Sequence, residues 1–476
     1  MDYLITLDGP NHLYTSGTFY KVLGGDDFYS SYFQINHRFT PNYFTVFVLG
    51  GLQSIFGGAV ALKTFHLLHI ILLLFSSYFW SNSSKDKWRK LPFLILPFVY
   101  SYLFFSGFYN FIFATSLSML TIGFFDRFQE IQWKSRHYFL IGLLLLVVYI
   151  SHIVPFFFVG LYFTADLIVS WKAQKWSKIY LKHPLKLLAY SSPGIILTFL
   201  FMSGKNTSYE YLEFNELIAR ITSGFSISIK NETAEDIVWI NWIKLIYLGI
   251  ALMLFIYSIL QKSKKMYSLG IATGLTLILY FILPDSAGFA SVFSVRIEYI
   301  FWIFVIIGAT RIQFEKQFIQ LFPAVLGLSM LIFQINSNLP HWRLLNGHAK
   351  SILTATTFID DGSIVYPVFN SLYWDDYHIS NLMGTTNKKI LVLENTSARQ
   401  DYFPIIYNSS YEDCLKSTKQ RDFTCENQSM QLDYLLIVGK FVLDPSDTIA
   451  TNLYAEAYKN GEVVFEDDLV QLLKFN

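Results

Sequence analysis

The residues most suited to chemistry stand at the start of the chain, where a carboxylate and an imidazole are four residues apart. Asp8 and His12 belong to the segment 7–12 (LDGPNH). If a helix begins at Gly9-Pro10, this spacing puts the two side chains about one turn apart. They could then act in general-base catalysis or help to bind a divalent cation. The simpler alternative is that Asp8 only caps the helix.

Three cationic side chains are candidates for binding a phosphate, namely Arg38, Lys63 and Arg296. A guanidinium offers a fork of donors that suits phosphate oxygens, and an ionisable residue within a membrane span is a functional candidate. Each also has a simpler interpretation. Arg38 could lie among lipid headgroups, Lys63 could extend to them from its helix end, and Arg296 could pair with Asp285 or Glu298.

Other polar side chains are predicted to contribute to binding at the same membrane face. They are His66, one turn from Lys63, then Asn110, His152 and Asp285 in short connections, and Trp374 and His378 in the polar and aromatic cluster 373–378. That cluster could cover a site at the membrane surface. Alternatively, Asn110 and His152 only satisfy backbone groups of their loops.

Membrane helices must position these residues. The 476 residues are 53% hydrophobic and 15% charged, whereas soluble domains are roughly 25% charged. This composition excludes a soluble enzyme, and a net charge of +1 gives no indication of a nucleic-acid partner. Apolar runs of spanning length predict about ten transmembrane helices. The predicted spans are 59–80, 91–106, 108–125, 138–151, 153–171, 187–203, 238–260, 266–284, 297–310 and 318–336.

The distribution of charge predicts the orientation, because cytoplasmic loops collect Lys and Arg. Alternate connections between these spans hold seventeen basic residues, whereas the connections on the other side hold six. The second side is acidic and carries nearly all of the candidate residues. The chemistry is therefore predicted to face away from the cytoplasm.

The segments at both ends of the membrane region are predicted to lie on the outer side. Segment 43–57 is apolar but short, which favours an interfacial or re-entrant helix. No hydrophobic span precedes residues 1–41, so either a first helix is missing or residues 1–7 are its remnant; we favour the missing helix. The predicted regions are an outer loop with a juxtamembrane helix (1–58), a transmembrane domain (59–336) and a small soluble α/β domain (337–476).

The C-terminal region alternates β-rich runs with helix-like stretches. Strands are predicted at 363–368, 389–394, 434–438 and 462–465, and helices at 341–359 and 448–458, the first of them after a turn at Pro340. Cys414 and Cys425 could form a disulfide or remain unpaired. The sequence has no phosphate-binding loop, dinucleotide fingerprint, zinc-protease motif or nucleophile elbow.

This layout resembles the GT-C superfamily of polytopic membrane glycosyltransferases. Asp8 in its segment is similar to the acidic position of the first outer loop in that superfamily. Residues 41–43 before a short apolar segment resemble its juxtamembrane helix, and residues 61–63 resemble the basic start of its second span. The segments 107–111, 151–156 and 283–296 are similar to those of bacterial GT-C-like proteins. Gly9 stands where many members have a second acidic residue, so a divalent cation is implied only as an option.

The resemblance implies transfer of a sugar from a polyprenyl-phosphate donor to an outer acceptor, which could be a glycan, a lipid or a protein. Asp8 would be the base of an inverting reaction, and Lys63 or Arg296 would hold the lipid phosphate. The implied location is the bacterial inner membrane. The alternatives are a transporter or assembly protein for a lipid-linked glycan, and a GT-C scaffold without activity. A transporter should carry polar residues near the bilayer midplane, whereas most of those found here lie towards span ends.

Overall fold

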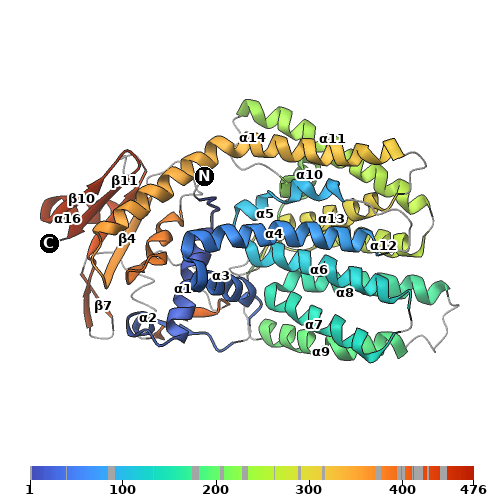
Figure 1. Ribbon diagram of the computed structural model, residues 1–476, viewed down its shortest axis with the longest axis horizontal. Helices are drawn as coiled ribbons and strands as arrows, with labels where there is room; N and C mark the ends of the chain where they lie inside the picture. Colours follow the sequence, from blue (N-terminus) through green and yellow to red (C-terminus); the bar gives the residue numbers. More distant parts are fainter. Residues whose placement is uncertain are drawn as a thin grey trace. The chain divides into compact units, whose positions relative to one another are not determined.

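The fold was analysed in a computed structural model of the chain (Figure 1). The residues that the structure describes are 3–38, 40–83, 92–131, 133–173, 182–203, 208–227, 234–261, 263–287, 291–312, 317–369, 377–393, 398, 402–409, 411, 422–425, 428–439 and 448–475. They form two compact units. The sheet unit consists of residues 1–67 and 339–476, and the helix unit consists of residues 68–338.

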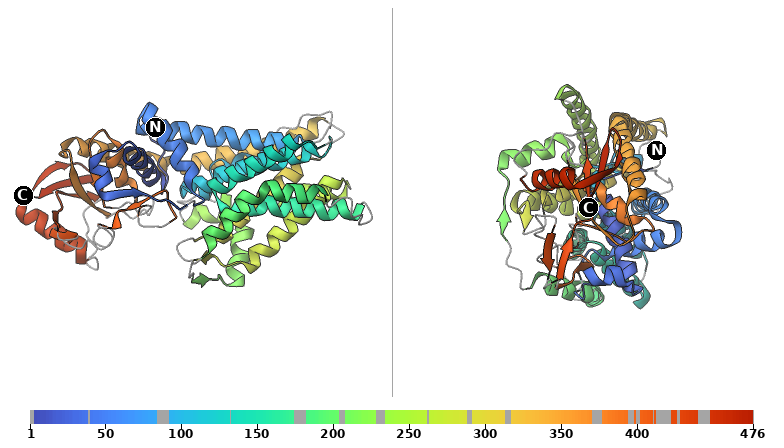
Figure 2. Two further views of the ribbon diagram at one scale, coloured as in Figure 1. Left: turned by 90° about the horizontal axis from the view of Figure 1, so that it is seen from below. Right: turned by 90° about the vertical axis from the view of Figure 1, so that its left-hand side faces the viewer.

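The helix unit is a bundle of apolar helices that pack side by side (Figures 1 and 2). Its helices are α6 (Tyr109–Phe128), α7 (Ser135–Ser151), α8 (Ile153–Ala173), α9 (Lys182–Met202), α11 (Ala234–Leu260), α12 (Lys264–Ile282) and α13 (Phe293–Thr310), and it shares α4 (Gly58–Ser81) and α14 (Gln317–Ala355) with the sheet unit. Among the described residues, eight helices are long and apolar enough to cross a membrane. The predicted polytopic helical membrane fold is therefore confirmed.

Short elements connect these helices. They are η1 (Phe93–Phe98), α5 (Tyr102–Phe105), α10 (Phe214–Ser223), η3 (Phe225–Ile227) and the paired strands β2 (Tyr209–Glu210) and β3 (Ser286–Ala287). The prediction of a continuous helix over 91–106 is wrong, because η1 contains Pro97 and ends before α5 starts. Proline removes a backbone donor and clashes with the preceding turn of an α-helix, so the segment around Pro97 is a 3-10 helix, and the chain then turns at residues 99–101 before α5.

The prediction of a helix that ends at residue 336 and a second helix after Pro340 is also wrong. α14 runs without interruption through this proline. The periodic buried residues Leu345, Ala349 and Ile352 continue one helical face beyond it. Packing of that face outweighs the local cost of the proline, which is about 3 kcal/mol in a helix interior.

The sheet unit is built on five strands in the order β10-β11-β9-β4-β5. These are β4 (Ser363–Phe369), β5 (Ile390–Val392), β9 (Tyr434–Val438), β10 (Gly461–Glu466) and β11 (Val470–Phe475), with β4 parallel to β5 and β9 and the other pairs antiparallel. Each of the four predicted strands is present in part or in full, and α16 (Thr448–Asn460) matches a predicted helix. The strand β11 was not predicted. A separate hairpin is formed by β7 (Asp422–Cys425) and β8 (Gln428–Gln431).

The N-terminal segment completes the sheet unit. Its elements are α1 (Gly9–Leu23), α2 (Asp27–Tyr32), β1 (Phe33–Ile35) and α3 (Tyr43–Phe56). β1 pairs antiparallel with β6 (Ile405–Tyr407), so the two ends of the chain are joined by backbone hydrogen bonds. The η6 helix (Ile379–Thr385) also packs against α1. The predicted short apolar helix of segment 43–57 is α3, which ends at Gly57 with φ +77°.

A buried polar network joins the helix ends that the charge pattern assigns to the cytoplasmic side. The Asp126 carboxylate accepts hydrogen bonds from Trp80 Nε1 at 3.1 Å and from the Tyr162 hydroxyl at 2.7 Å. It also pairs with Arg311 at 2.8 Å, and Arg311 donates to the Trp80 carbonyl at 3.0 Å. The Asp126 carboxylate thus connects α4, α6, α8 and the residue after α13.

Candidate functional site

Asp8 occupies the position directly before α1, but its side chain does not cap that helix. Instead, its Oδ1 lies 3.5 Å from Nε2 of His378. The Asp8 side chain remains 25% exposed and that of His378 10% exposed. The structure therefore disfavours the interpretation of Asp8 as a cap and gives its carboxylate a histidine partner that a ligand can approach.

Local structure fixes the position of His378. It precedes η6, and its carbonyl accepts hydrogen bonds from the backbone N–H of Asn381 at 3.1 Å and from the Asn381 side chain at 3.2 Å. The Tyr377 ring lies edge-on to the imidazole, with ring centroids 4.9 Å apart. Because Asn381 is itself buried, the start of η6 holds His378 towards α1.

His12 lies one turn further along α1. Its backbone N–H donates to the Asp8 carbonyl at 2.8 Å, as the predicted helix requires. The imidazole is buried, and its centroid is 6.1 Å from that of Phe403. The predicted catalytic role of His12 stays a prediction.

Two tyrosines attach α1 and α2 to the edge strand β5. The Tyr14 hydroxyl donates to the Ile390 carbonyl at 3.0 Å and accepts from the Val392 N–H at 3.3 Å. The Tyr29 hydroxyl accepts from the Ile390 N–H at 3.4 Å and from Lys21 Nζ at 3.0 Å. Burial raises the pKa of Tyr14 well above its ordinary value, so its hydroxyl stays protonated. These contacts use backbone groups that an edge strand would otherwise leave open.

Two of the predicted cations in the sheet unit are exposed. Arg38 lies in a turn, where its N–H donates to Asn36 Oδ1 at 3.0 Å. Lys63 is exposed on α4, whereas His66 on the next turn is buried. Trp374 lies outside the described residues, as does Cys414.

In the helix unit, Arg296 lies in the first turn of α13 and is only 8% exposed. Its guanidinium stands 4.6 Å from the centre of the Phe108 ring and 5.5 Å from that of Phe293. His152 lies within the electrostatic influence of Arg296, and its ring is edge-on to that of Phe111, with ring centroids 5.4 Å apart. The structure thus gathers the two predicted short connections and Arg296 at one point.

The other predicted residues near this point have structural contacts. Asp285 accepts from the N–H and the hydroxyl of Ser294, at 2.9 and 2.5 Å, and so caps α13. It also pairs with Arg220 at 3.5 Å, while Glu298 accepts from the Ser226 N–H at 3.1 Å. Asp285 and Glu298 thus each bind other groups of the helix unit.

The residue before α13 is conformationally strained, and Asn110 at the start of α6 is buried. Val292 has φ +55°, in the left-handed region that a β-branched residue rarely adopts. Such strain is commonly found at functional sites. Asn110 is buried in the first turn of α6, where the sequence predicted a polar side chain at the mouth of the bundle.

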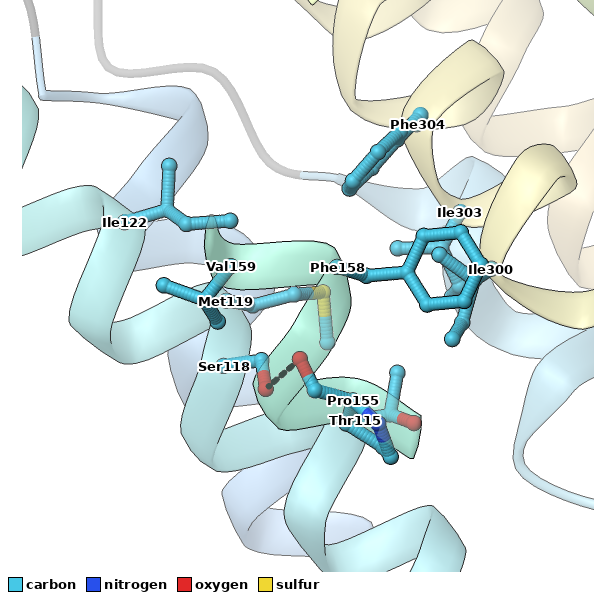
Figure 3. Close-up of a pocket in the computed structure, with 10 residues that line it drawn as sticks. All are labelled: Thr115, Ser118, Met119, Ile122, Pro155, Phe158, Val159, Ile300, Ile303 and Phe304. Carbon is cyan, nitrogen blue, oxygen red and sulfur yellow. Dashed lines mark hydrogen bonds between the residues drawn. The ribbon is translucent and has the colours of Figure 1, made fainter. Parts of the chain in front are cut away.

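Within the described ranges, no three His, Cys, Asp or Glu side chains gather as metal ligands do. Such a group is thus absent around Asp8 among the residues that the structure describes, and the divalent cation that the sequence allowed stays a prediction. A small void in the helix unit, of about 10 Å³, lies between α6, α8 and α13 (Figure 3). The Ser118 hydroxyl beside it donates to the Pro155 carbonyl at 3.4 Å. At this size the void is a packing defect rather than a substrate site.

Comparison with known proteins shows which solved structures this fold resembles. No family model matches the sequence, and no curated protein matches it. The structure is similar to that of ArnT from Cupriavidus metallidurans bound to undecaprenyl phosphate, with a TM-score of 0.56 and 11% identity over 99% of this chain and 94% of that one. It is equally similar to ArnT in the apo state, with a TM-score of 0.55 and 12% identity over the same shares. These likenesses confirm the GT-C-like fold.

Proposed function

We propose that this chain is an integral-membrane glycosyltransferase that uses a polyprenyl-phosphate sugar as donor and an extracytoplasmic glycan, lipid or protein as acceptor. The fold supports the proposal, since ArnT has been solved with a polyprenyl phosphate, undecaprenyl phosphate, bound. The observation that carries it is the Asp8 carboxylate, which stands at a helix start without capping it and faces His378.

In this mechanism Asp8 is the general base. Its carboxylate takes the proton of an acceptor hydroxyl while the hydroxyl oxygen attacks the anomeric carbon of the donor sugar. The bond between that carbon and the phosphate oxygen breaks, and its electron pair leaves with the lipid phosphate. Attack opposite the leaving group inverts the anomeric configuration. His378 orients the Asp8 carboxylate through its contact with Oδ1.

Arg296 is proposed to stabilise the phosphate that leaves. Negative charge develops on the phosphate in the transition state, and a guanidinium held in a site of low polarity stabilises it more strongly than one in water. The rings of Phe108 and Phe293 lie against the guanidinium and help to keep it in place. Six further residues remain candidates for donor binding, namely Arg38, Lys63, His66, Asn110, His152 and Asp285.

The proposed location is the bacterial inner membrane, with the C-terminal domain on the outer side. The pairing of β1 with β6 supports this arrangement, because strands that share hydrogen bonds must lie on the same side of the bilayer. The charge pattern assigns the first loop, which contains β1, to the outer side.

The test is turnover of a donor panel by the purified protein. We expect release of polyprenyl phosphate from at least one polyprenyl-phosphate sugar, faster in the presence of an outer-membrane or envelope lipid extract than without it. Absence of turnover of every donor, in a preparation whose folding is verified by thermal unfolding, would contradict the proposal and favour a transporter or an inactive scaffold.

A further inference from the structure

A cavity within the sheet unit has no part in the mechanism above. Its volume is about 110 Å³. Its walls come from Tyr3, α1, the start of α4, α14 and the end of η6. The apolar lining residues are Leu13, Gly58, Ala59, Leu62, Leu353 and Leu382, and the polar ones are Tyr3, Thr385 and Thr386. The cavity therefore joins four elements that are far apart in the sequence.

Three lining residues carry a hydroxyl group, namely Tyr3, Thr385 and Thr386, and the protein engages those of the two threonines. Thr385 donates to the Leu382 carbonyl at 2.7 Å, and Thr386 donates to the Met383 carbonyl at 3.0 Å. What remains for a ligand is hydrocarbon surface together with the side chain of Tyr3. An aliphatic cavity of roughly 150 Å³ in another protein stays dry and binds small apolar molecules. A cavity of this size and lining suits a short hydrocarbon segment rather than a sugar or a charged group.

The cavity shares two of its walls with the Asp8–His378 contact. α1 begins directly after Asp8 and contributes Leu13, and η6 begins directly after His378 and contributes Leu382. Five residues of helix correspond to about 7.5 Å along the axis. The cavity wall at Leu13 thus lies about one and a half helical turns from Asp8, a distance that a hydroxyl-bearing chain of several bonds can span.

We infer that the cavity binds the hydrocarbon part of the acceptor. The acceptor is then an amphiphilic alcohol, with its reactive hydroxyl a few bonds from a hydrocarbon chain, rather than a glycan or a peptide. This inference rests on the proposed function, because it places the acceptor at Asp8. All residues that line the cavity belong to the sheet unit, which carries the base, whereas Arg296 belongs to the helix unit.

The membrane supplies such a ligand directly. Three of the lining residues lie in the first turns of α4, which is long and apolar enough to span the bilayer; they are Gly58, Ala59 and Leu62. The chain of a lipid in the same leaflet can reach these turns without leaving the membrane. A soluble acceptor would gain nothing from an aliphatic wall at this position.

The neighbouring residues Ala59 and Val60 give a matched pair of variants. Ala59 lines the cavity, whereas Val60 is 50% exposed on the same helix and does not line it. Ala59→Leu fills the cavity and Val60→Leu adds one methylene outside it. Gly58 is less suitable, since a Cβ there would lie 3.2 Å from Thr385 Oγ1 and could displace the wall itself.

The first experiment is photolabelling of the full chain in detergent with a medium-chain alkanol that carries a diazirine on its hydrocarbon. We expect labelling of Leu13, Leu62 or Leu353, reduced at least about tenfold by Ala59→Leu and unchanged by Val60→Leu. Labelling confined to other residues, or equal in the two variants, would overturn the inference. Displacement of the probe by polyprenyl phosphate alone would also overturn it, because the cavity would then hold the donor chain.

The second experiment measures transfer to a series of alcohols of increasing chain length. KM should fall about fourfold for each added methylene until the cavity is full, and Ala59→Leu should remove this dependence. Transfer to glycan or peptide acceptors only would overturn the inference and leave the proposed function intact. Labelling as expected without turnover of any donor would contradict the proposed function, while the preference of the cavity for amphiphilic alcohols would stand.

Discussion

At the scale of single residues, the two groups proposed for the reaction are held by different means. Asp8 is placed by the start of a helix and by His378, and it stays accessible to a ligand. Arg296 is nearly enclosed, with aromatic rings on its guanidinium. An exposed base can receive a proton from an incoming hydroxyl, and an enclosed cation can stabilise a phosphate strongly because little water screens it.

Replacement of Arg296 should impair the departure of the phosphate. We expect Arg296→Gln to lower kcat/KM for the donor by about 10²- to 10³-fold, as loss of one preorganised charge-stabilising group usually does. Arg127→Gln is the control, because Arg127 also lies over an aromatic ring, at 3.8 Å from Phe79, but near the far end of α6. Equal loss in the two variants, measured with a labelled donor, would argue against a specific role for Arg296.

At the scale of elements, α1 positions Asp8 and also covers the edge strand β5. Its Tyr14 uses one hydroxyl to satisfy a carbonyl and an N–H of β5, and Tyr29 satisfies a second N–H of the same strand. The helix therefore takes the place of a further strand along this part of the sheet edge. Displacement of α1 would expose these backbone groups and would move Asp8 at the same time.

Removal of the Tyr14 hydroxyl should destabilise the sheet unit. We expect Tyr14→Phe to cost about 1–3 kcal/mol, because it leaves two buried backbone groups without their partner. Tyr20→Phe is a suitable comparison, since that hydroxyl donates at 3.1 Å to the Phe47 carbonyl in an exposed position. Thermal unfolding should show a clear decrease for Tyr14→Phe and a smaller one for Tyr20→Phe; the reverse order would refute the role assigned to Tyr14.

The buried pair of Asp126 and Arg311 gives a second prediction at this scale. Asp126→Ala should lower the unfolding free energy by about 3–5 kcal/mol, because it leaves the Arg311 charge buried without the carboxylate. The double variant Asp126→Leu/Arg311→Met should recover much of that loss. If the double variant is as unstable as the sum of the two single ones in thermal unfolding, the two residues do not act as a pair.

At the scale of the whole molecule, the charge pattern and the strand pairing predict the same sidedness. The loops rich in Lys and Arg alternate with the outer connections, and β1 joins the first of these to the C-terminal region through β6. The proposal requires Asp8, Arg296 and the sheet of the C-terminal region to face the outer side.

Labelling of single cysteines in a variant without Cys414 and Cys425 tests this sidedness. Glu462→Cys, exposed on β10, should react with a membrane-impermeant maleimide in intact cells from which only the outer envelope has been removed. Gln261→Cys, exposed between α11 and α12, should react only after the membrane is permeabilised. The opposite pattern would invert the topology and remove the proposed access to lipid-linked donors on the outer face.

The sequence was sufficient to predict the features that depend on local composition. Apolar runs predicted most of the spans, and Pro10 after Asp8 predicted the start of α1. Features that depend on tertiary packing were missed. The contact of Asp8 with His378 joins opposite ends of the chain, and the continuity of α14 through Pro340 depends on packing of its buried face. Of the predicted site residues, the structure brings together Asp8 with His378 and His152 with Arg296.

The central claim is that Asp8 acts as the base of a glycosyl transfer, and one comparison tests it most directly. Single-turnover transfer from a bound polyprenyl-phosphate sugar should be about 10³-fold slower or more in Asp8→Asn, since the amide cannot accept the proton. Asp26→Asn is the matched control, because Asp26 is also at a helix start of the sheet unit but caps α2 through its side chain. Transfer at wild-type rate in Asp8→Asn, or equal loss in both variants, would contradict the account.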